Sequence, residues 1–245
     1  MKLSEEKLLI DGPAGKIDIL VENHGAPRGI ALICHPHPLF GGGNTNKVAQ
    51  TLARTFARLE YVALRPNFRG VGESEGTHDE GRGETADLLA VLAEAKRRYG
   101  DLPVALAGFS FGAYVQTHVA RALAEAGHPA QRLVLVGTTS GFVEGTRSYD
   151  TESVPGDTIV IHGSEDETVP LANVLAWARP LELPVIVVPG ADHFFTADCT
   201  SSAKLSHALG DTECRSCAPH QTRTTNENLM RPDFRSVIQS PDFYC

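Results

Sequence analysis

The chain has 245 residues, 42% of them hydrophobic, which is enough for one sizeable folded domain. Its formal net charge of −8, with no basic stripe, argues against nucleic acid as a partner. No run approaches about 18 apolar residues, and glutamates near the N-terminus are untypical of a signal peptide. We therefore expect a cytoplasmic protein with no membrane partner.

Strand-like runs alternate with helical patterns through most of the chain. The predicted strands are Lys7–Ile10, Ile17–Glu22, Ile30–Cys34, Tyr61–Arg65, Val104–Ala107, Leu133–Val136, Thr158–His162 and Val185–Val188. The predicted helices are Asn46–Leu59, Gly83–Tyr99, Phe111–Ala126 and Leu171–Trp177. Near-continuous apolar strands are typical of parallel sheets that are covered on both faces. The pattern predicts an α/β fold, a doubly wound, mainly parallel eight-stranded sheet with helices on both faces.

Residues 108–112 read GFSFG and join a predicted strand to a predicted helix. This context is typical of a nucleophile elbow, in which Ser110 would be the nucleophile. The flanking glycines would let strand and helix pass closely, while the serine takes a strained backbone conformation. The turn would also direct the backbone N–H of Phe111 at the space beside the serine oxygen.

An acid and a histidine follow the elbow, each beyond a later predicted strand. Asp166 follows Thr158–His162, and His193 follows Val185–Val188. We predict that His193 is the base that activates Ser110, and that Asp166 holds the imidazole in the correct tautomer.

Other carboxylates compete with Asp166 for that role. Glu165 and Glu167 flank it, and Asp192 directly precedes the histidine. Side chains of adjacent residues usually diverge, which disfavours Asp192. We favour Asp166 for this role.

Five phrases of this chain together resemble a known family: HPHPLFGG, RPNFRGVGESEG, GFSFG, HGSEDETVP and GADHFF. They are similar to those of small, lidless bacterial serine hydrolases, esterase-like members of the α/β-hydrolase superfamily. The chain order Ser110, Asp166, His193 is also the order of that superfamily. The resemblance implies that Asp166 holds the family's position for the acid, four residues before Pro170. The resemblance covers about residues 5–196, and it implies a hydrolase domain at residues 1–196.

Ester hydrolysis on this fold needs two N–H donors for the oxyanion. Phe111 would supply one, and the loop HPHPLFGGG at residues 35–43 would supply the other. Its prolines have no N–H, so the candidates are His37, Leu39 or a later residue of the loop.

Two patterns admit a metal interpretation, namely the pair His35 and His37, and the motif Cys214-x-x-Cys217. Neither offers the further ligands that a zinc site needs at a recognisable spacing. We expect no metal and no other cofactor.

Residues 137–157 stand where many α/β-hydrolases insert a helical cap. The segment is short and rich in Thr, Ser, Gly and Glu. We expect no cap domain and an open, shallow site.

Residues 197–245 form an atypical, polar C-terminal tail. The tail holds four of the five cysteines and one glycine, and its apolar residues follow no period. We expect it to be poorly ordered, with at most two helical turns at Ala203–Leu209. Because the fifth cysteine, Cys34, lies in an apolar strand, a disulfide framework is not implied.

Two functions from different classes follow from the sequence. The first is a serine hydrolase that cleaves small-molecule carboxylic esters with short or medium acyl groups, because Leu39, Phe40, Phe111, Phe194 and Phe195 would lie nearby. Esterase, thioesterase and peptidase stay open within that class. The alternative is a catalytically impaired scaffold or binding protein on the same fold, suggested by the anomalous C-terminus. The sequence carries no signal for an oligomeric state.

Overall fold

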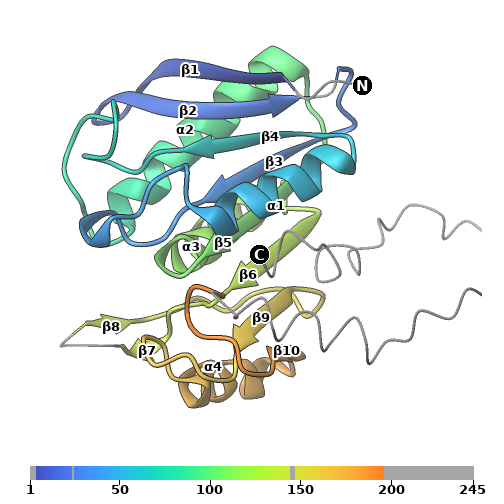
Figure 1. The fold of residues 1–245 in the computed structure, drawn as a ribbon. Helices are drawn as coiled ribbons and strands as arrows, with labels where there is room; N and C mark the ends of the chain where they lie inside the picture. Colours follow the sequence, from blue (N-terminus) through green and yellow to red (C-terminus); the bar gives the residue numbers. More distant parts are fainter. Residues whose placement is uncertain (1–3, 24, 144–146, 196–245) are drawn as a thin grey trace, which may run out of the picture.

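A mainly parallel sheet of eight strands forms the centre of the computed structural model, which describes residues 4–23, 25–143 and 147–195 (Figure 1). β2 pairs antiparallel with both of its neighbours, whereas all other neighbouring strands are parallel. The order across the sheet is β1 (Ser4–Gly12), β2 (Gly15–Asn23), β4 (Tyr61–Pro66), β3 (Gly29–Cys34), β5 (Val104–Phe109), β6 (Arg132–Val136), β9 (Ile159–Gly163) and β10 (Val185–Val188).

Helices cover both faces of the sheet, as the side chains of β3 show, since they alternate between two cores. Ile30 and Leu32 belong to a core with the apolar residues of α2 (Arg82–Tyr99) and α3 (Phe111–Glu125). Ala31 and Ile33 point the other way and pack with α1 (Lys47–Arg58). Successive side chains of a strand face opposite sides, so a fully apolar strand can be buried by two layers. The predicted fold class is confirmed.

A third, smaller core lies under α4 (Leu171–Ala178). Val174 and Ala178 of this helix pack with Val160 of β9 and with Leu183. The helix therefore covers the end of the sheet where β9 and β10 lie (Figure 1).

Short elements connect the main ones. They are the 3₁₀ helices η1 (Pro38–Phe40) and η2 (Arg179–Leu181), and a hairpin of β7 (Gly141–Phe142) and β8 (Ser148–Tyr149). The hairpin is the only regular structure in the described part of residues 137–157, so no cap domain stands there. Within the described ranges, no helix is both long and apolar enough to span a bilayer. The predicted tail at residues 197–245 lies outside the described residues.

Candidate active site

Ser110 occupies a sharp turn between the end of β5 at Phe109 and the start of α3 at Phe111. Its φ of 56° and ψ of −120° are a strained combination for a residue with a side chain. The Ser110 N–H donates to the carbonyl of Val136 at 2.8 Å, which ties the turn to β6. Because Phe111 is the first residue of the helix, its N–H has no acceptor within the helix.

The glycines on either side of the serine allow three backbone segments to meet. A Cβ on Gly108 would overlap the carbonyl of Gly112. A Cβ on Gly112 would overlap the carbonyls of Cys34 and His35 at the end of β3. Any larger residue would push α3 away from the sheet and move the serine with it.

The three residues predicted as a triad lie in one hydrogen-bonded chain. The distance from Ser110 Oγ to His193 Nε2 is 2.9 Å. The distance from His193 Nδ1 to Asp166 Oδ2 is 2.7 Å. In the matching tautomer, the serine hydroxyl donates to Nε2 and the Nδ1–H donates to the carboxylate. All three residues are at most 6% exposed, so bulk water does not compete for these bonds.

The second carboxylate oxygen of Asp166 is also engaged. Oδ1 accepts the backbone N–H of Val169 at 2.7 Å, which fixes the carboxylate at the end of β9. The competing candidates Glu165 and Glu167 are exposed, and Asp192 is half-buried.

Aromatic rings hold the imidazole of His193 in place. The ring centroid of Phe109 lies 5.1 Å from that of His193, at an interplanar angle of 33°. Phe194 packs edge-on against the same imidazole at 5.1 Å. These contacts restrict the rotation of the imidazole and leave its Nε2 directed at the serine.

A cleft of about 680 Å³ opens at Ser110 and His193. Its walls combine apolar side chains and glycines with polar side chains. The other described residues that line it are Pro36, His37, Phe40, Gly41, Gly42, Asn46, Arg147, Thr168 and Phe194. Sequence reasoning did not single out Arg147 or Thr168, because no motif or period marks either position.

The loop after β3 contributes His37, but not Leu39, to this cleft. The Leu39 N–H donates to Nδ1 of His37 at 3.3 Å, and the Leu39 side chain is 69% exposed. Leu39 therefore does not take the position expected of an oxyanion donor. Of the donors named from the sequence, Phe111 directly follows the serine in the chain and His37 lines the cleft.

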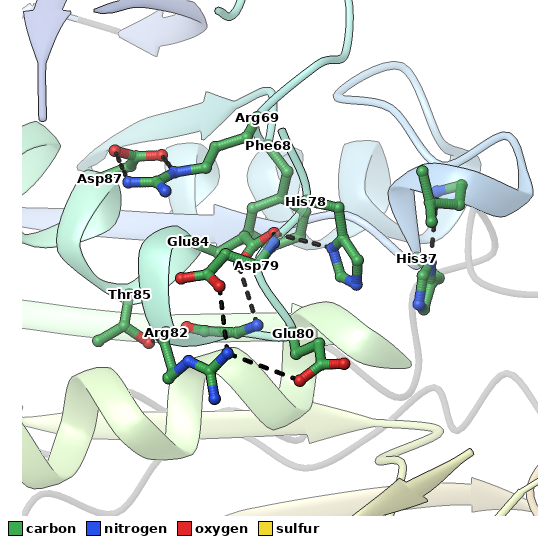
Figure 2. Close-up of polar contacts among 12 residues, drawn as sticks. His37, Phe68, Arg69, His78, Asp79, Glu80, Arg82, Glu84, Thr85 and Asp87 are labelled. Atoms are coloured by element: carbon green, nitrogen blue, oxygen red, sulfur yellow. Dashed lines mark hydrogen bonds and ion pairs between the residues drawn. The ribbon is translucent and has the colours of Figure 1, made fainter. Parts of the chain in front are cut away.

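Behind the cleft, His37 rests on a second histidine (Figure 2). The ring centroids of His37 and His78 lie 4.7 Å apart. His78 Nδ1 contacts the buried carboxylate of Glu84 at 2.8 Å, and Glu84 also accepts the N–H groups of Asp79 and Gly81. Burial, followed by the charges of His78 and Arg147, lowers the pKa of His37 to about 4. His37 is therefore neutral at neutral pH.

His35 is a structural residue of the same loop. Its Nδ1 lies 2.7 Å from the carbonyl of Pro36, and its Nε2 accepts the N–H of Phe68 at 2.9 Å. Both ring nitrogens are thus used within the protein, and no lone pair remains for a metal ion. Among the described residues, no group of three or more His, Cys, Asp or Glu side chains could hold a metal. The motif Cys214-x-x-Cys217 lies outside those residues.

Arg69 braces the loop that follows β4 (Figure 2). Its Nε and Nη2 contact the two carboxylate oxygens of Asp87 in α2 at 2.5 and 3.1 Å. Phe68 precedes Arg69, and its backbone N–H donates to Nε2 of His35. The ion pair between Arg69 and Asp87 therefore also supports the loop that carries His37.

Comparisons with known proteins agree with this architecture. A family model described as "alpha/beta hydrolase fold" matches residues 32–153. The uncharacterized protein RP471 of Rickettsia prowazekii is 31% identical in an alignment 220 residues long, which covers 84% of this chain and 87% of that protein. The lysophosphatidylserine lipase ABHD12 of mouse is 34% identical over 132 residues, which are 54% of this chain but only 31% of the lipase.

Two solved structures are similar over almost their whole length. An α/β serine hydrolase homologue from Coxiella burnetii is 36% identical, with a TM-score of 0.65, over 85% of this chain and 97% of that chain. A member of the α/β serine hydrolases without a lid, from Xanthomonas campestris, is 32% identical, with a TM-score of 0.69, over 85% and 93%. Given this sheet, this elbow and these relatives, the chain belongs to the α/β-hydrolase superfamily.

Proposed function

We propose that the protein is a serine hydrolase that cleaves carboxylic esters through an acyl-enzyme. The observation that carries the proposal is the continuous chain from Ser110 through His193 to Asp166 at the base of an open cleft. Nucleophile, base and orienting acid are within hydrogen-bond distance of one another, as this chemistry requires.

In the proposed first half-reaction, Ser110 Oγ attacks the ester carbonyl carbon while His193 Nε2 takes the hydroxyl proton. The N–H groups of Phe111 and His37 stabilise the oxyanion of the tetrahedral intermediate. The intermediate collapses when the imidazolium returns its proton to the departing alcohol, which leaves the acyl group on the serine. Asp166 stabilises the positive imidazolium and keeps Nδ1 protonated.

In the second half-reaction, water replaces the alcohol. His193 removes a proton from the water as the water attacks the acyl carbon, and then protonates Ser110 as the carboxylic acid leaves. Neither half-reaction requires a cofactor.

The lining of the cleft supports short or medium acyl groups as substrates. Pro36, Phe40 and Phe194 supply apolar surface, and a cleft of about 680 Å³ suits a small molecule. The similarity to a lipase named for lysophosphatidylserine supports an ester bond as the target. We place cleavage of oxygen esters ahead of thioesters and amides.

A fluorophosphonate probe and p-nitrophenyl acetate test the proposal. The wild-type protein should be labelled and should hydrolyse the ester, and Ser110→Ala should lose both while staying folded. Ser74→Ala is a matched control, since residues 72–76 also read G-x-S-x-G but lie in the loop after β4. Wild-type protein that is neither labelled nor active would favour the scaffold or binding role. Equal turnover by wild type and Ser110→Ala would show that Ser110 is not the nucleophile.

Butyrate derivatives separate the three reactions left open by the sequence. The p-nitrophenyl ester, the matching thioester and the p-nitroanilide carry the same acyl group on different leaving groups. We expect the highest kcat/KM for the oxygen ester, and a higher value for the anilide would assign the protein to the peptidases.

A further inference from the structure

The charged side chain on the wall of the catalytic cleft is opposite in sign to the net charge of the molecule, although the Asp166 carboxylate lies behind His193. The protein carries a formal net charge of −8. The described residues that line the cleft nevertheless include one arginine, Arg147, and no aspartate or glutamate. His37 on the same wall is neutral, since its pKa is lowered to about 4 by burial and by the charges of His78 and Arg147. At neutral pH, the formal charge on the described wall therefore comes from Arg147.

Arg147 is held at this wall by its backbone and by two aromatic side chains. Its carbonyl accepts the N–H of Val143 at 3.1 Å, directly before β8. The guanidinium carbon lies 4.3 Å from the ring centroid of Phe40, over the ring. Arg147 also interacts with Tyr149. Burial raises the pKa of the Tyr149 hydroxyl, and the charge and hydrogen bond of Arg147 offset part of that rise.

This arrangement leaves the guanidinium well suited to a second role. A guanidinium carries five N–H donors in a planar fork, so it can bind an anion while it also contacts Phe40 and Tyr149. The edge of a guanidinium matches the spacing of carboxylate and phosphate oxygens. The half-buried position of Arg147 strengthens such a contact relative to one in bulk water.

We infer that Arg147 selects ester substrates that carry an anionic group, a carboxylate or a phosphate, next to an apolar segment that packs on Phe40 and Phe194. The inference rests on the proposed serine esterase activity and adds its substrate class. The anion would pair with the guanidinium edge while the ester carbonyl lies at Ser110. Arg147 would thus be a specificity-determining residue, with no part in the bond-breaking steps.

Pairs of matched esters test this inference. Mono-p-nitrophenyl adipate and p-nitrophenyl hexanoate have acyl chains of six carbons and differ in a terminal carboxylate. On the alcohol side, 4-acetoxybenzoate and its methyl ester differ in the same way. The measured quantity is the ratio of kcat/KM for the anionic ester to that for the neutral ester in each pair.

We expect a ratio of about 10 or more for at least one pair with the wild-type enzyme. A hydrogen bond to a charged group adds roughly that factor more to a binding constant than a hydrogen bond between neutral groups. Arg147→Gln should bring the ratio to about one, Arg147→Glu should bring it below one, and Arg147→Lys should keep part of it. Added salt should reduce the wild-type ratio, since it screens a half-exposed charge pair. Arg97→Gln, at the exposed end of α2, is the matched control and should keep the wild-type ratio.

The outcomes separate this inference from the proposed activity. If the enzyme hydrolyses all four esters with ratios near one, Arg147 does not select anions and the inference is wrong. A high ratio that survives in Arg147→Gln also overturns it, because another group must then bind the anion. If none of the four esters is hydrolysed, the proposed esterase activity itself fails.

Discussion

Nε2 of His162 lies 3.4 Å from Oδ2 of Asp166, the same oxygen that contacts His193. His162 is fully buried near the end of β9, and its Nε2 lies 2.9 Å from the carbonyl of Val169. A carbonyl can only accept, so Nε2 carries the proton. Because the Val169 N–H donates to Asp166, one residue links the histidine and the carboxylate through its two backbone groups.

This linkage predicts that His162 positions the acid of the triad. His162→Leu removes the donor to the Val169 carbonyl, and a buried carbonyl without a partner costs about 1–3 kcal/mol of unfolding free energy. The loop can then relax and shift the carboxylate of Asp166. We expect kcat/KM for p-nitrophenyl acetate to fall by about 10- to 100-fold, mostly through kcat.

His162→Gln is the conservative variant, because its side-chain amide can donate near the position of Nε2. It should recover most of the lost kcat, and its pH–rate profile should resemble that of the wild type. His162→Leu should instead keep its loss in kcat when the two variants are compared at equal folded fraction. If both variants match the wild-type kcat at equal folded fraction, His162 has no positioning role.

Asp166→Asn should lower kcat by about 10³- to 10⁴-fold, because an amide no longer requires the tautomer of His193 that accepts the serine proton. The loss should appear in kcat with little change of fold, as judged by circular dichroism. Asp192→Asn is the matched control, since Asp192 was the rival candidate that adjoins the histidine in sequence. A comparable loss in Asp192→Asn, with activity retained in Asp166→Asn, would reassign the acid.

The sheet and its helices could be predicted from sequence because their signals are local. Predicted helix Phe111–Ala126 corresponds to α3 at Phe111–Glu125, and predicted strand Val185–Val188 is β10. Strand β1 extends from Ser4 to Gly12, beyond the predicted Lys7–Ile10. The extra residues at its start are polar, and an edge strand pairs through its backbone without needing apolar side chains there. The two-residue strands β7 and β8 are too short for any period to reveal them.

The pattern G-x-S-x-G shows why motif context matters. It occurs at residues 72–76 as well as at 108–112. Ser74 of the first copy is buried, donates to the carbonyl of Asn67 and accepts the N–H of Asp18, so it fastens a loop. Only the second copy follows a strand and opens a helix. Arg147 and His78 reach the site through loops of no regular pattern, which is why sequence reasoning missed them.

The buried His35 predicts a loss of stability in acid. Burial lowers the pKa of His35 from 6.5 to about 4. Between these values the unfolded chain binds a proton that the folded protein does not, so unfolding free energy falls as the pH falls. The contribution of His35 should be fully present above pH 6.5 and lost by pH 4, a change of about 3 kcal/mol.

Urea unfolding at pH 7, 6, 5 and 4 measures this change. His35→Gln removes the titrating group and can still accept from Phe68 through its amide oxygen. The variant should therefore lose less stability than the wild type between pH 7 and 4, whatever its stability at pH 7. If the unfolding free energies of the two proteins fall by the same amount between pH 7 and 4, His35 is not the group responsible.

Gly112→Ala tests the close approach of the elbow to β3. A Cβ at this position would overlap the carbonyls of Cys34 and His35, and backbone cannot move aside as a flexible side chain can. We expect a loss of about 1–3 kcal/mol or more, which lowers the melting temperature by roughly 3–10 °C in a domain of this size. Because α3 carries the Phe111 N–H and begins beside Ser110, kcat should fall as well.

Gly156→Ala is the control for Gly112→Ala, since a Cβ at residue 156 meets nothing within 4 Å. It should leave the melting temperature unchanged or slightly higher, as the unfolded chain loses entropy. An equal melting temperature for the two variants would mean that the helix yields without cost, and the proposed reason for the elbow glycine would be wrong.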